Sequence, residues 1–251
     1  MKKSFLNHSE PLLVSMVQGR SAARIEELTD LSRADGADAV GMQFCVLDPA
    51  ERSPETYRRL FAHADMPTYV TNYRSGGNKG KSDERLAEEL LELAECGATL
   101  CDVMGDYFDV CEGELTMEPE AVRRQMELID GLHARGAEVL MSSHVLKFTP
   151  PERVLEIALE HERRGADICK IVVGAKSMEQ QIENLHIIGL LKKTLKIPFL
   201  FLSGGECRIL RRVGGELGCC MYLGVHEYDE LATKVQPILS ELTAIRGYMK
   251  G

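Results

Sequence analysis

Two polar residues lie in predicted strands where apolar side chains are usual. Lys170 stands in the run GADICKIVVG, residues 165–174, and His144 ends the run EVLMSSH, residues 138–144. A strand buried on both faces is nearly all hydrophobic, so a lysine at its centre needs a partner or a function. Burial favours the neutral amine, which can attack a ketone or aldehyde and form a Schiff base. A histidine nearby could then carry protons at neutral pH.

Each of these two residues also has a structural interpretation. Lys170 could pair with a structural carboxylate or extend its stem toward solvent, although the centre of a strand offers few routes to solvent. His144 alone is no more typical of a catalytic residue than of a structural one. Neighbouring strands lie about 4.8 Å apart, so the two side chains could face each other, and this favours the catalytic interpretation of both.

A third feature is the segment LSGGECRILRR, residues 202–212. Backbone N–H groups of a glycine-rich loop at a helix start favour an anion, and one arginine could bind a carboxylate or phosphate with two hydrogen bonds. Of Arg208, Arg211 and Arg212, we expect two to belong to a solvated helix face. Arg74, at the root of the loop NYRSGGNKGKS, could also reach the site.

These residues need a scaffold, and the sequence predicts one from a repeated pattern. Helical patterns end in glycine and lead into apolar runs at DGADAV, CGATLC, RGAEVL and RGADIC, as expected of β/α units with a parallel sheet. We expect strands at 12–17, 38–44, 67–73, 98–104, 138–145, 167–173, 197–203 and 219–225. The final segment, 231–251, reads as a helix that Pro237 breaks or delays.

Eight strands alternating with helices predict a (β/α)8 TIM barrel, with residues 1–251 forming a single domain. A doubly wound open sheet is the alternative, but no G-x-G-x-x-G follows the first strand. In a barrel of this kind the active site lies at the carboxyl ends of the strands. Lys170 and His144 would then enter it from the sixth and fifth strands.

Composition limits the classes of function. The chain has 251 residues, 44% hydrophobic and 27% charged, with a net charge of −9 that argues against nucleic acid or an anionic membrane as partner. No apolar run is long enough for a membrane span and the start does not resemble a signal peptide, so we expect a cytoplasmic protein. Eight cysteines without a C-x-x-C pair favour reduced, buried thiols over structural zinc.

Several blocks of the sequence resemble one family. MSSHVLKFTPP (141–151), GADICKIVV (165–173) and FLSGGECRILRRVGGELGCCMYLG (201–224) are similar to the fifth, sixth and seventh-to-eighth strand segments of the type I 3-dehydroquinate dehydratases. PTYVTNYRSGG (67–77) is similar to their third strand. These are (β/α)8 Schiff-base lyases of the shikimate pathway of aromatic amino acid biosynthesis.

The resemblance implies a site and a mechanism. Lys170 would condense with the substrate ketone, and His144 would remove the adjacent proton and return it to the leaving hydroxyl. Arg211 would bind the substrate carboxylate and Arg74 would assist. We therefore expect a small keto acid as ligand, with no metal, organic cofactor, nucleic acid or membrane partner. A homodimer is compatible with the sequence.

The chain departs from the family pattern on the second and fourth strands. Where the family carries a glutamate and an arginine that address substrate hydroxyls, this chain has Gly41 and Gln43. Met104 replaces the glutamate that supports the histidine, and Asp106 could substitute only if the backbone shifts. We expect the histidine to be more loosely oriented as a result.

Two further departures lie near the end of the chain. VHEYDELATKVQ, residues 225–236, lacks the family's S-x-P-G-Q motif, and Cys219 replaces a usual serine. We assign Lys170 and His144 as catalytic. Four residues complete the substrate-binding set: Arg211, Arg74, Gln43 and Ser203. The missing groups predict a divergent Schiff-base lyase that acts on a keto acid, either 3-dehydroquinate with weak activity or a related substrate.

Two other functions stay open at this stage. A class I aldolase acting on a phosphorylated sugar would use SGGE, residues 203–206, to hold the phosphate. A barrel without activity could instead bind a small acid or a protein partner and keep Lys170 only by descent.

Overall fold

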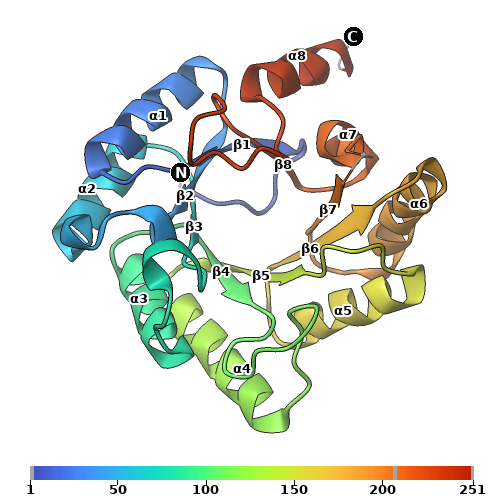
Figure 1. The fold of residues 1–251 in the computed structure, drawn as a ribbon, viewed down its shortest axis with the longest axis horizontal. Helices are drawn as coiled ribbons and strands as arrows, with labels where there is room; N and C mark the ends of the chain where they lie inside the picture. The colour runs from blue at the N-terminus through green and yellow to red at the C-terminus, as the bar shows by residue number, and fades with distance from the viewer. Residues whose placement is uncertain (1–2, 206–207, 250–251) are drawn as a thin grey trace.

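The computed structural model describes residues 3–205 and 208–249, and its strands form one parallel sheet that curves into a nearly closed barrel (Figure 1). The strand order is β7-β6-β5-β4-β3-β2-β1-β8, and a backbone hydrogen bond from Cys220 to Phe199 joins the two ends. The strands are β1 Leu12–Val17, β2 Ala39–Gln43, β3 Thr68–Thr71, β4 Leu100–Met104, β5 Glu138–His144, β6 Ile168–Ala175, β7 Phe199–Gly205 and β8 Met221–Gly224. The predicted (β/α)8 barrel is confirmed.

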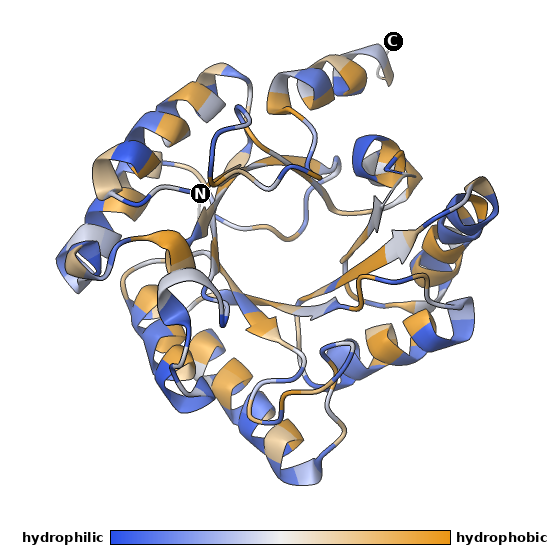
Figure 2. Ribbon diagram, viewed as in Figure 1, coloured by the Kyte–Doolittle hydropathy of each residue, from blue (hydrophilic) through white to orange (hydrophobic). Residues whose placement is uncertain are grey.

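Helices surround the strands (Figure 1), and their apolar faces turn toward the barrel (Figure 2). The α-helices are α1 Ala22–Ala34, α2 Pro54–Ala64, α3 Asp83–Glu95, α4 Pro119–Ala134, α5 Pro151–Arg163, α6 Met178–Thr194, α7 Leu210–Leu217 and α8 Leu239–Met249. Short 3-10 helices follow β2 and β3: η1 Phe44–Val46, η2 Pro49–Glu51 and η3 Gly76–Asn78.

Local sequence explains where the elements begin and end. Serines accept a backbone hydrogen bond at the N-caps of α1 and α3, namely Ser21 and Ser82. Two of the predicted helix–strand joints contain Gly97 and Gly165, which have φ values of 110° and 95°. These left-handed values favour glycine and let the chain turn from the helix into the next strand.

The last helix begins only after Pro237. Residues 225–238 form a loop at the carboxyl end of the barrel, and α8 starts at Leu239, so the predicted delay is confirmed. Within the described residues, no helix is long and apolar enough to cross a membrane. Glu206 and Cys207, which the sequence placed in the anion-binding loop, lie outside the described residues.

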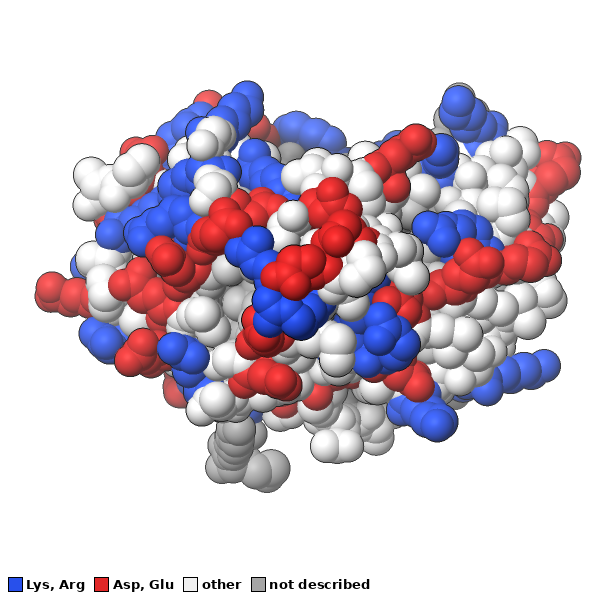
Figure 3. Space-filling model, turned by 90° about the horizontal axis from the view of Figure 1, so that it is seen from below, with Lys and Arg blue, Asp and Glu red and all other residues white. Residues whose placement is uncertain are grey.

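The cysteines and the surface charges have no special arrangement. The thiols of the seven described cysteines are free, and five of these residues are buried. On the side of the molecule shown in Figure 3, acidic and basic side chains are interspersed. Arg123 on α4, for example, pairs with Glu120 and Glu127.

Candidate active site

The carboxyl ends of the strands surround a cavity of about 190 Å³, here called the inner cavity. It opens beside a vestibule of about 560 Å³ that shares Tyr73, His144 and Leu146 with it. The inner cavity is lined by polar residues (Gln43, Thr71, Tyr73, His144, Lys170, Arg211, Thr233 and Gln236) and by apolar ones (Met16, Leu146, Val172, Leu202, Leu223 and Val235). Lys170, His144, Arg211 and Gln43 therefore meet in one place.

Lys170 points into the barrel from β6 and is only 4% exposed. Its Nζ donates hydrogen bonds to Tyr73 Oη at 2.8 Å, to Tyr69 Oη at 3.0 Å and to Asp102 Oδ2 at 3.1 Å. Lys170 therefore has a buried carboxylate partner, as the structural interpretation requires. It also lines the inner cavity, as the catalytic interpretation requires.

Asp102 on β4 is the anionic centre of this cluster and is 1% exposed. It accepts hydrogen bonds from Ser142 Oγ at 2.5 Å, from Tyr73 Oη at 2.6 Å and from Tyr69 Oη. Burial alone would raise the pKa of the Asp102 carboxyl, but the Lys170 charge and these hydroxyl groups hold it below its ordinary value. Sequence reasoning missed Asp102, although an aspartate inside the apolar run LCDVM is the same kind of signal as Lys170.

His144, at the end of β5, has a carboxylate partner that was not expected. Its Nδ1 lies 2.7 Å from Glu114 Oε2, and its backbone N–H donates to the same oxygen at 3.0 Å. The ring also packs edge-on against Tyr73, with centroids 5.4 Å apart. The expectation of a loosely oriented histidine is therefore wrong. Met104 does leave a gap in the family pattern, but Glu114 fills it from the loop of residues 105–118.

The sequence explains how this loop brings Glu114 to β5. Gly105 allows close approach, because a Cβ there would lie 2.4 Å from the Glu114 carbonyl oxygen. Ser143 Oγ donates to that same oxygen at 2.6 Å. The buried guanidinium of Arg164 donates to the carbonyls of Gly105 and Thr116 at 3.1 and 2.6 Å, so it ties both ends of the loop.

Arg211, in the first turn of α7, is a buried cation at the wall of the inner cavity. It is 5% exposed, and its Nε donates to the Ser203 carbonyl at 2.9 Å. Among the residues that the structure describes, no carboxylate pairs with it. Burial, and then the nearby Arg208 charge, lowers the pKa of Arg211 to about 10, so it stays charged near neutrality. A buried cation of this kind favours an anionic ligand. Arg208 is exposed, and we expected two of the three arginines in this segment to be solvated.

Arg74 lines the vestibule, but two carboxylates already engage it. Its guanidinium donates to both oxygens of Asp83 and to Asp106 Oδ1, each at 2.7 Å. Burial alone would lower the pKa of Arg74, but these hydrogen bonds raise it above its ordinary value. The charge is thus compensated within the protein. Asp106, considered as a replacement partner for His144, is instead a partner of Arg74.

Ser203 is not where the substrate-binding prediction placed it. Its hydroxyl lies 3.2 Å from Asn184 Nδ2 on α6, on the outer face of the barrel. In β7 the neighbouring Leu202 lines the cavity, and side chains alternate along a strand, so Ser203 faces outward. Its carbonyl oxygen still contributes by accepting the Arg211 hydrogen bond.

The opposite wall of the inner cavity comes from β1 and β2 and is largely neutral. A side chain at Gly41 would meet Met16 Sδ at 2.2 Å, so Met16 fills the space that a glutamate there would use. Gln43 lines the cavity as predicted, and its Oε1 accepts a hydrogen bond from Gln18 Nε2 at 2.7 Å.

The loop of residues 225–238 closes this wall without the family motif. Thr233 donates its backbone N–H to Gln18 Oε1 at 3.1 Å, which ties the loop to β1. Gln236 lines the cavity, is 8% exposed, and its Oε1 has no hydrogen-bond partner among the described residues. The Oγ1 of Thr71 is likewise buried and unpaired there. Thr233 and Gln236 were not predicted, because this segment lacks the S-x-P-G-Q motif that would have marked them.

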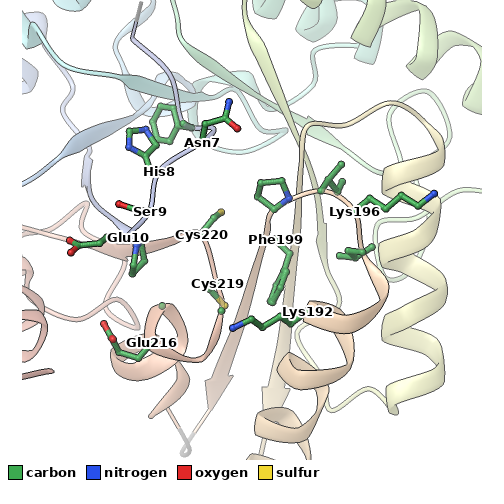
Figure 4. Close-up of a pocket in the computed structure, with 17 residues that line it drawn as sticks. Asn7, His8, Ser9, Glu10, Lys192, Lys196, Phe199, Glu216, Cys219 and Cys220 are labelled. Atoms are coloured by element: carbon green, nitrogen blue, oxygen red, sulfur yellow. The ribbon is translucent and has the colours of Figure 1, made fainter. Parts of the chain in front are cut away.

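A second hollow of about 470 Å³ lies at the amino ends of β1, β7 and β8 (Figure 4). It is lined by residues such as Lys192, Glu216 and Cys219. Burial raises the pKa of the Cys219 thiol to about 12, so this cysteine is not an activated nucleophile. Lys170, His144 and Arg211 lie at the opposite, carboxyl ends of the strands, where the active site of a (β/α)8 barrel is expected.

Comparisons with known proteins identify a family and several relatives of this chain. The family model described as type I 3-dehydroquinase matches residues 12–243. The 3-dehydroquinate dehydratases of Alkaliphilus oremlandii and Geobacillus thermodenitrificans are 32% and 29% identical over 111 and 164 residues, or 43% and 64% of this chain. These alignments span 42% and 60% of the two relatives, less than two thirds of their length. The enzyme of Listeria monocytogenes is 22% identical over 89% of this chain and 87% of its own.

Solved structures show the same fold at low sequence identity. The 3-dehydroquinate dehydratase of Geobacillus kaustophilus superposes with a TM-score of 0.83 at 18% identity, covering 99% of this chain and 95% of that one. The type I enzyme of Clostridium difficile, solved with covalently modified comenic acid, gives a TM-score of 0.81 at 19% identity, covering 96% and 93%. From the span of the family match, the chain belongs to the type I 3-dehydroquinase family.

Proposed function

We propose that this protein is a Schiff-base lyase that dehydrates a cyclic keto acid of the 3-dehydroquinate class. The observation that carries the proposal is the convergence of Lys170, His144 and Arg211 on the inner cavity. An amine, a proton carrier and an anion-binding cation are the groups that an imine-based elimination on a keto acid requires. The family and the names of its relatives support the same reaction type.

The reaction begins at the substrate ketone. Nζ of Lys170 condenses with the carbonyl carbon and releases water, which leaves an iminium ion. His144 then removes a proton from the adjacent carbon, and the electron pair moves toward the iminium nitrogen. When the pair returns, it expels the hydroxyl group on the next carbon, and His144 gives its proton to that oxygen. Hydrolysis of the imine releases the enone, 3-dehydroshikimate if the substrate is 3-dehydroquinate, and regenerates Lys170.

Three residues hold these groups in place for the reaction. Arg211 binds the substrate carboxylate, because it is a buried cation without a carboxylate partner among the described residues. Glu114 accepts a hydrogen bond from Nδ1 of His144, which fixes the tautomer so that Nε2 is the atom that faces the substrate. Arg74 acts as a positioning residue that holds the loop of Asp106 to the start of α3.

We further propose that substrate hydroxyls are recognised differently from the family pattern. Met16 occupies the space beside Gly41, and the nearby polar groups are the neutral side chains of Gln43, Thr71 and Gln236. Neutral hydrogen-bonding groups accept a substrate with fewer or displaced hydroxyls more readily than a charged pair does. The substrate is therefore a keto acid with one carboxylate, either 3-dehydroquinate or a less hydroxylated relative.

The test follows the wild-type protein with 3-dehydroquinate. We expect ultraviolet absorbance of the enone product to rise, and borohydride to trap an adduct that intact mass and peptide mapping place on Lys170. Cleavage of a sugar phosphate to two carbonyl products, without enone formation, would instead identify an aldolase. If no keto acid or sugar phosphate gives a Lys170 adduct, the protein is a binding barrel and the proposal is wrong.

A further inference from the structure

Two phenols contact the reacting nitrogen, and they differ mainly in their access to the cavity. Tyr69 and Tyr73 both accept a hydrogen bond from Lys170 Nζ, at 3.0 and 2.8 Å, and both donate to Asp102. Tyr69 is fully buried and does not line the inner cavity. Tyr73 is half-buried and lines both the cavity and the vestibule.

We propose that Tyr73 is a catalytic residue that relays protons at the imine nitrogen, a step that is distinct from the carbon chemistry of His144. The inference rests on the proposed function only in assuming that Lys170 forms an imine. Tyr73 Oη accepts a proton from Nζ on one side and donates its own to Asp102 on the other, so the three residues form a continuous relay. The matching relay through Tyr69 has no access to substrate.

The proton balance of this step closes without an external acid or base. The ammonium of Lys170 passes one proton to Asp102, directly or through Tyr73, and the free amine attacks the carbonyl carbon. The second amine proton and the one held by Asp102 reach the former carbonyl oxygen by way of Tyr73, so that this oxygen leaves as water. Nitrogen carries the positive charge before and after, and Asp102 balances the charge in both states.

The position of His144 leaves this task to Tyr73. In the β5–β6 register His144 pairs with Val172, whereas Lys170 pairs with Ser142, so the imidazole lies two residues farther along the strands. Within the described residues, no hydrogen bond joins His144 to Lys170. Tyr73 lies between them, bonded to Nζ and packed against the imidazole edge.

The phenol of Tyr73 is suited to a relay and not to a phenolate role. Burial, and then the charge of Asp102, raises the pKa of Tyr73 well above its ordinary value. The hydroxyl therefore stays protonated and exchanges one proton for another instead of accumulating charge.

The test compares Tyr73→Phe with Tyr69→Phe as its matched control. Each variant loses one bond to Nζ and one to Asp102. The rate of Lys170 adduct formation is measured by intact mass, at saturating cyanoborohydride, with 3-dehydroquinate and separately with pyruvate. General acid–base assistance is worth about 10²–10⁴-fold, so we expect Tyr73→Phe to slow trapping by at least about 100-fold with either probe. Tyr69→Phe should slow it by less than about tenfold.

Every outcome decides the point. Trapping by Tyr73→Phe at the wild-type rate, or equal losses in the two variants, overturns the relay, because the phenols would then only solvate the ion pair. Wild-type trapping with pyruvate but not 3-dehydroquinate contradicts the proposed substrate, while the comparison of the two variants still tests Tyr73. Wild-type trapping with neither probe overturns both.

A second measurement tests the relay in case the Tyr73→Phe variant does not fold. Incorporating 3-fluorotyrosine at position 73 keeps the hydroxyl and its hydrogen bonds but makes the phenol more acidic. We expect the trapping rate to change with this substitution at position 73 and not at position 69. An unchanged rate at position 73 contradicts the relay.

Discussion

The two walls of the inner cavity differ in the charge of the side chains that form them. On the side of β3 to β6, Lys170 pairs with Asp102 and His144 with Glu114. On the side of β1, β2 and the loop of residues 225–238, the lining is neutral and includes Met16, Gln43 and Gln236. We call these the charged wall and the neutral wall.

The difference explains which departures from the family pattern needed compensation. A histidine that presents one ring nitrogen to a ligand needs an acceptor at its other ring nitrogen, so the carboxylate missing from β4 has to be supplied from elsewhere. Glu114 supplies it from the loop of residues 105–118. On the neutral wall the loss of a charged side chain at Gly41 needed only an apolar filler, and Met16 provides it. Under the proposed function, the charged wall preserves the chemistry, while the neutral wall is free to change the substrate.

The largest effect should come from removing the charge of Lys170. We expect Lys170→Met to abolish the borohydride adduct and lower the dehydration rate by at least about 10⁴-fold, equivalent to about 5.5 kcal/mol. Because Asp102 then lacks its cation, unfolding in urea should show a loss of about 3–5 kcal/mol.

The double variant Lys170→Met, Asp102→Asn is the control for this loss. It should recover most of the stability and none of the activity. Adduct formation or substantial activity in either variant would contradict the role of Lys170.

A pH effect on stability should also arise behind the charged wall, at His161. This side chain is fully buried between Ser143 and Cys169, and burial, followed by the charge of Arg164, lowers its pKa to about 3. The unfolded chain binds a proton at His161 below about pH 6.5 and the folded chain does not, so stability falls as the pH drops from 6.5 toward 3. From pH 6.5 to 4.5 this group should cost about 2 kcal/mol.

Urea unfolding of His161→Gln at pH 6.5, 5.5 and 4.5 tests this. The variant keeps a side chain able to bond Ser143 but cannot titrate, so its stability should depend less on pH than that of the wild type. His186→Gln, at an exposed position on α6, is the matched control and should follow the wild type. Parallel curves for all three proteins would show that His161 does not titrate on unfolding.

A smaller effect on catalysis is expected from Glu114→Gln. The hydrogen bond to Nδ1 of His144 weakens, so kcat should fall about 10–100-fold with little change in KM. Borohydride should still trap the imine, because condensation precedes the step that uses His144. Glu112→Gln is the control, since Glu112 lies two residues away and pairs with Lys147 on the surface. Equal losses in both variants would mean that loop charge, and not alignment of His144, matters.

The smallest effects should come from the neutral wall. Gln43→Leu and Gln236→Leu each remove one neutral hydrogen-bonding group, worth about 0.5–1.5 kcal/mol, so kcat/KM should fall by about tenfold or less, mainly through KM. Steady-state kinetics on the substrate identified by the trapping assay measures this. A loss of 100-fold or more in kcat would mean that the neutral wall also takes part in catalysis. It would contradict the distinction between the charged wall and the neutral wall.

The sequence predicted the barrel and the central residues for physical reasons that act locally. Helix caps, glycine joints and apolar runs are short-range signals, so the predicted strands agree with the observed ones to within two residues at every end. Lys170 could be found because a charge inside an apolar strand is visible in the sequence. The same reasoning applied to the run LCDVM would have found Asp102.

The rest depended on long-range geometry. Glu114 reaches His144 because Gly105, Ser143 and Arg164 hold its loop. Arg164 lies 50 residues along the chain, and no periodicity records that contact. The assignment of Ser203 to the substrate-binding set was wrong. Which side chains of β7 face the cavity depends on the strand register, and the pairing of Lys170 with Leu200 puts Leu202, not Ser203, toward the cavity. Arg74 lines the vestibule, and its pairing with Asp83 and Asp106 could not be predicted because these partners come from other elements.

The placement of Glu114 has a consequence for how activity is lost on heating. A partner for the imidazole that sat on a strand would persist until the whole barrel melted. Glu114 instead sits in a loop, with a φ of 49°, held by a few hydrogen bonds to Ser143 and Arg164. Such segments open locally at lower free energy than the barrel around them. Thermal inactivation should therefore precede unfolding and reverse on cooling, with amide hydrogen exchange in residues 105–118 reporting the opening.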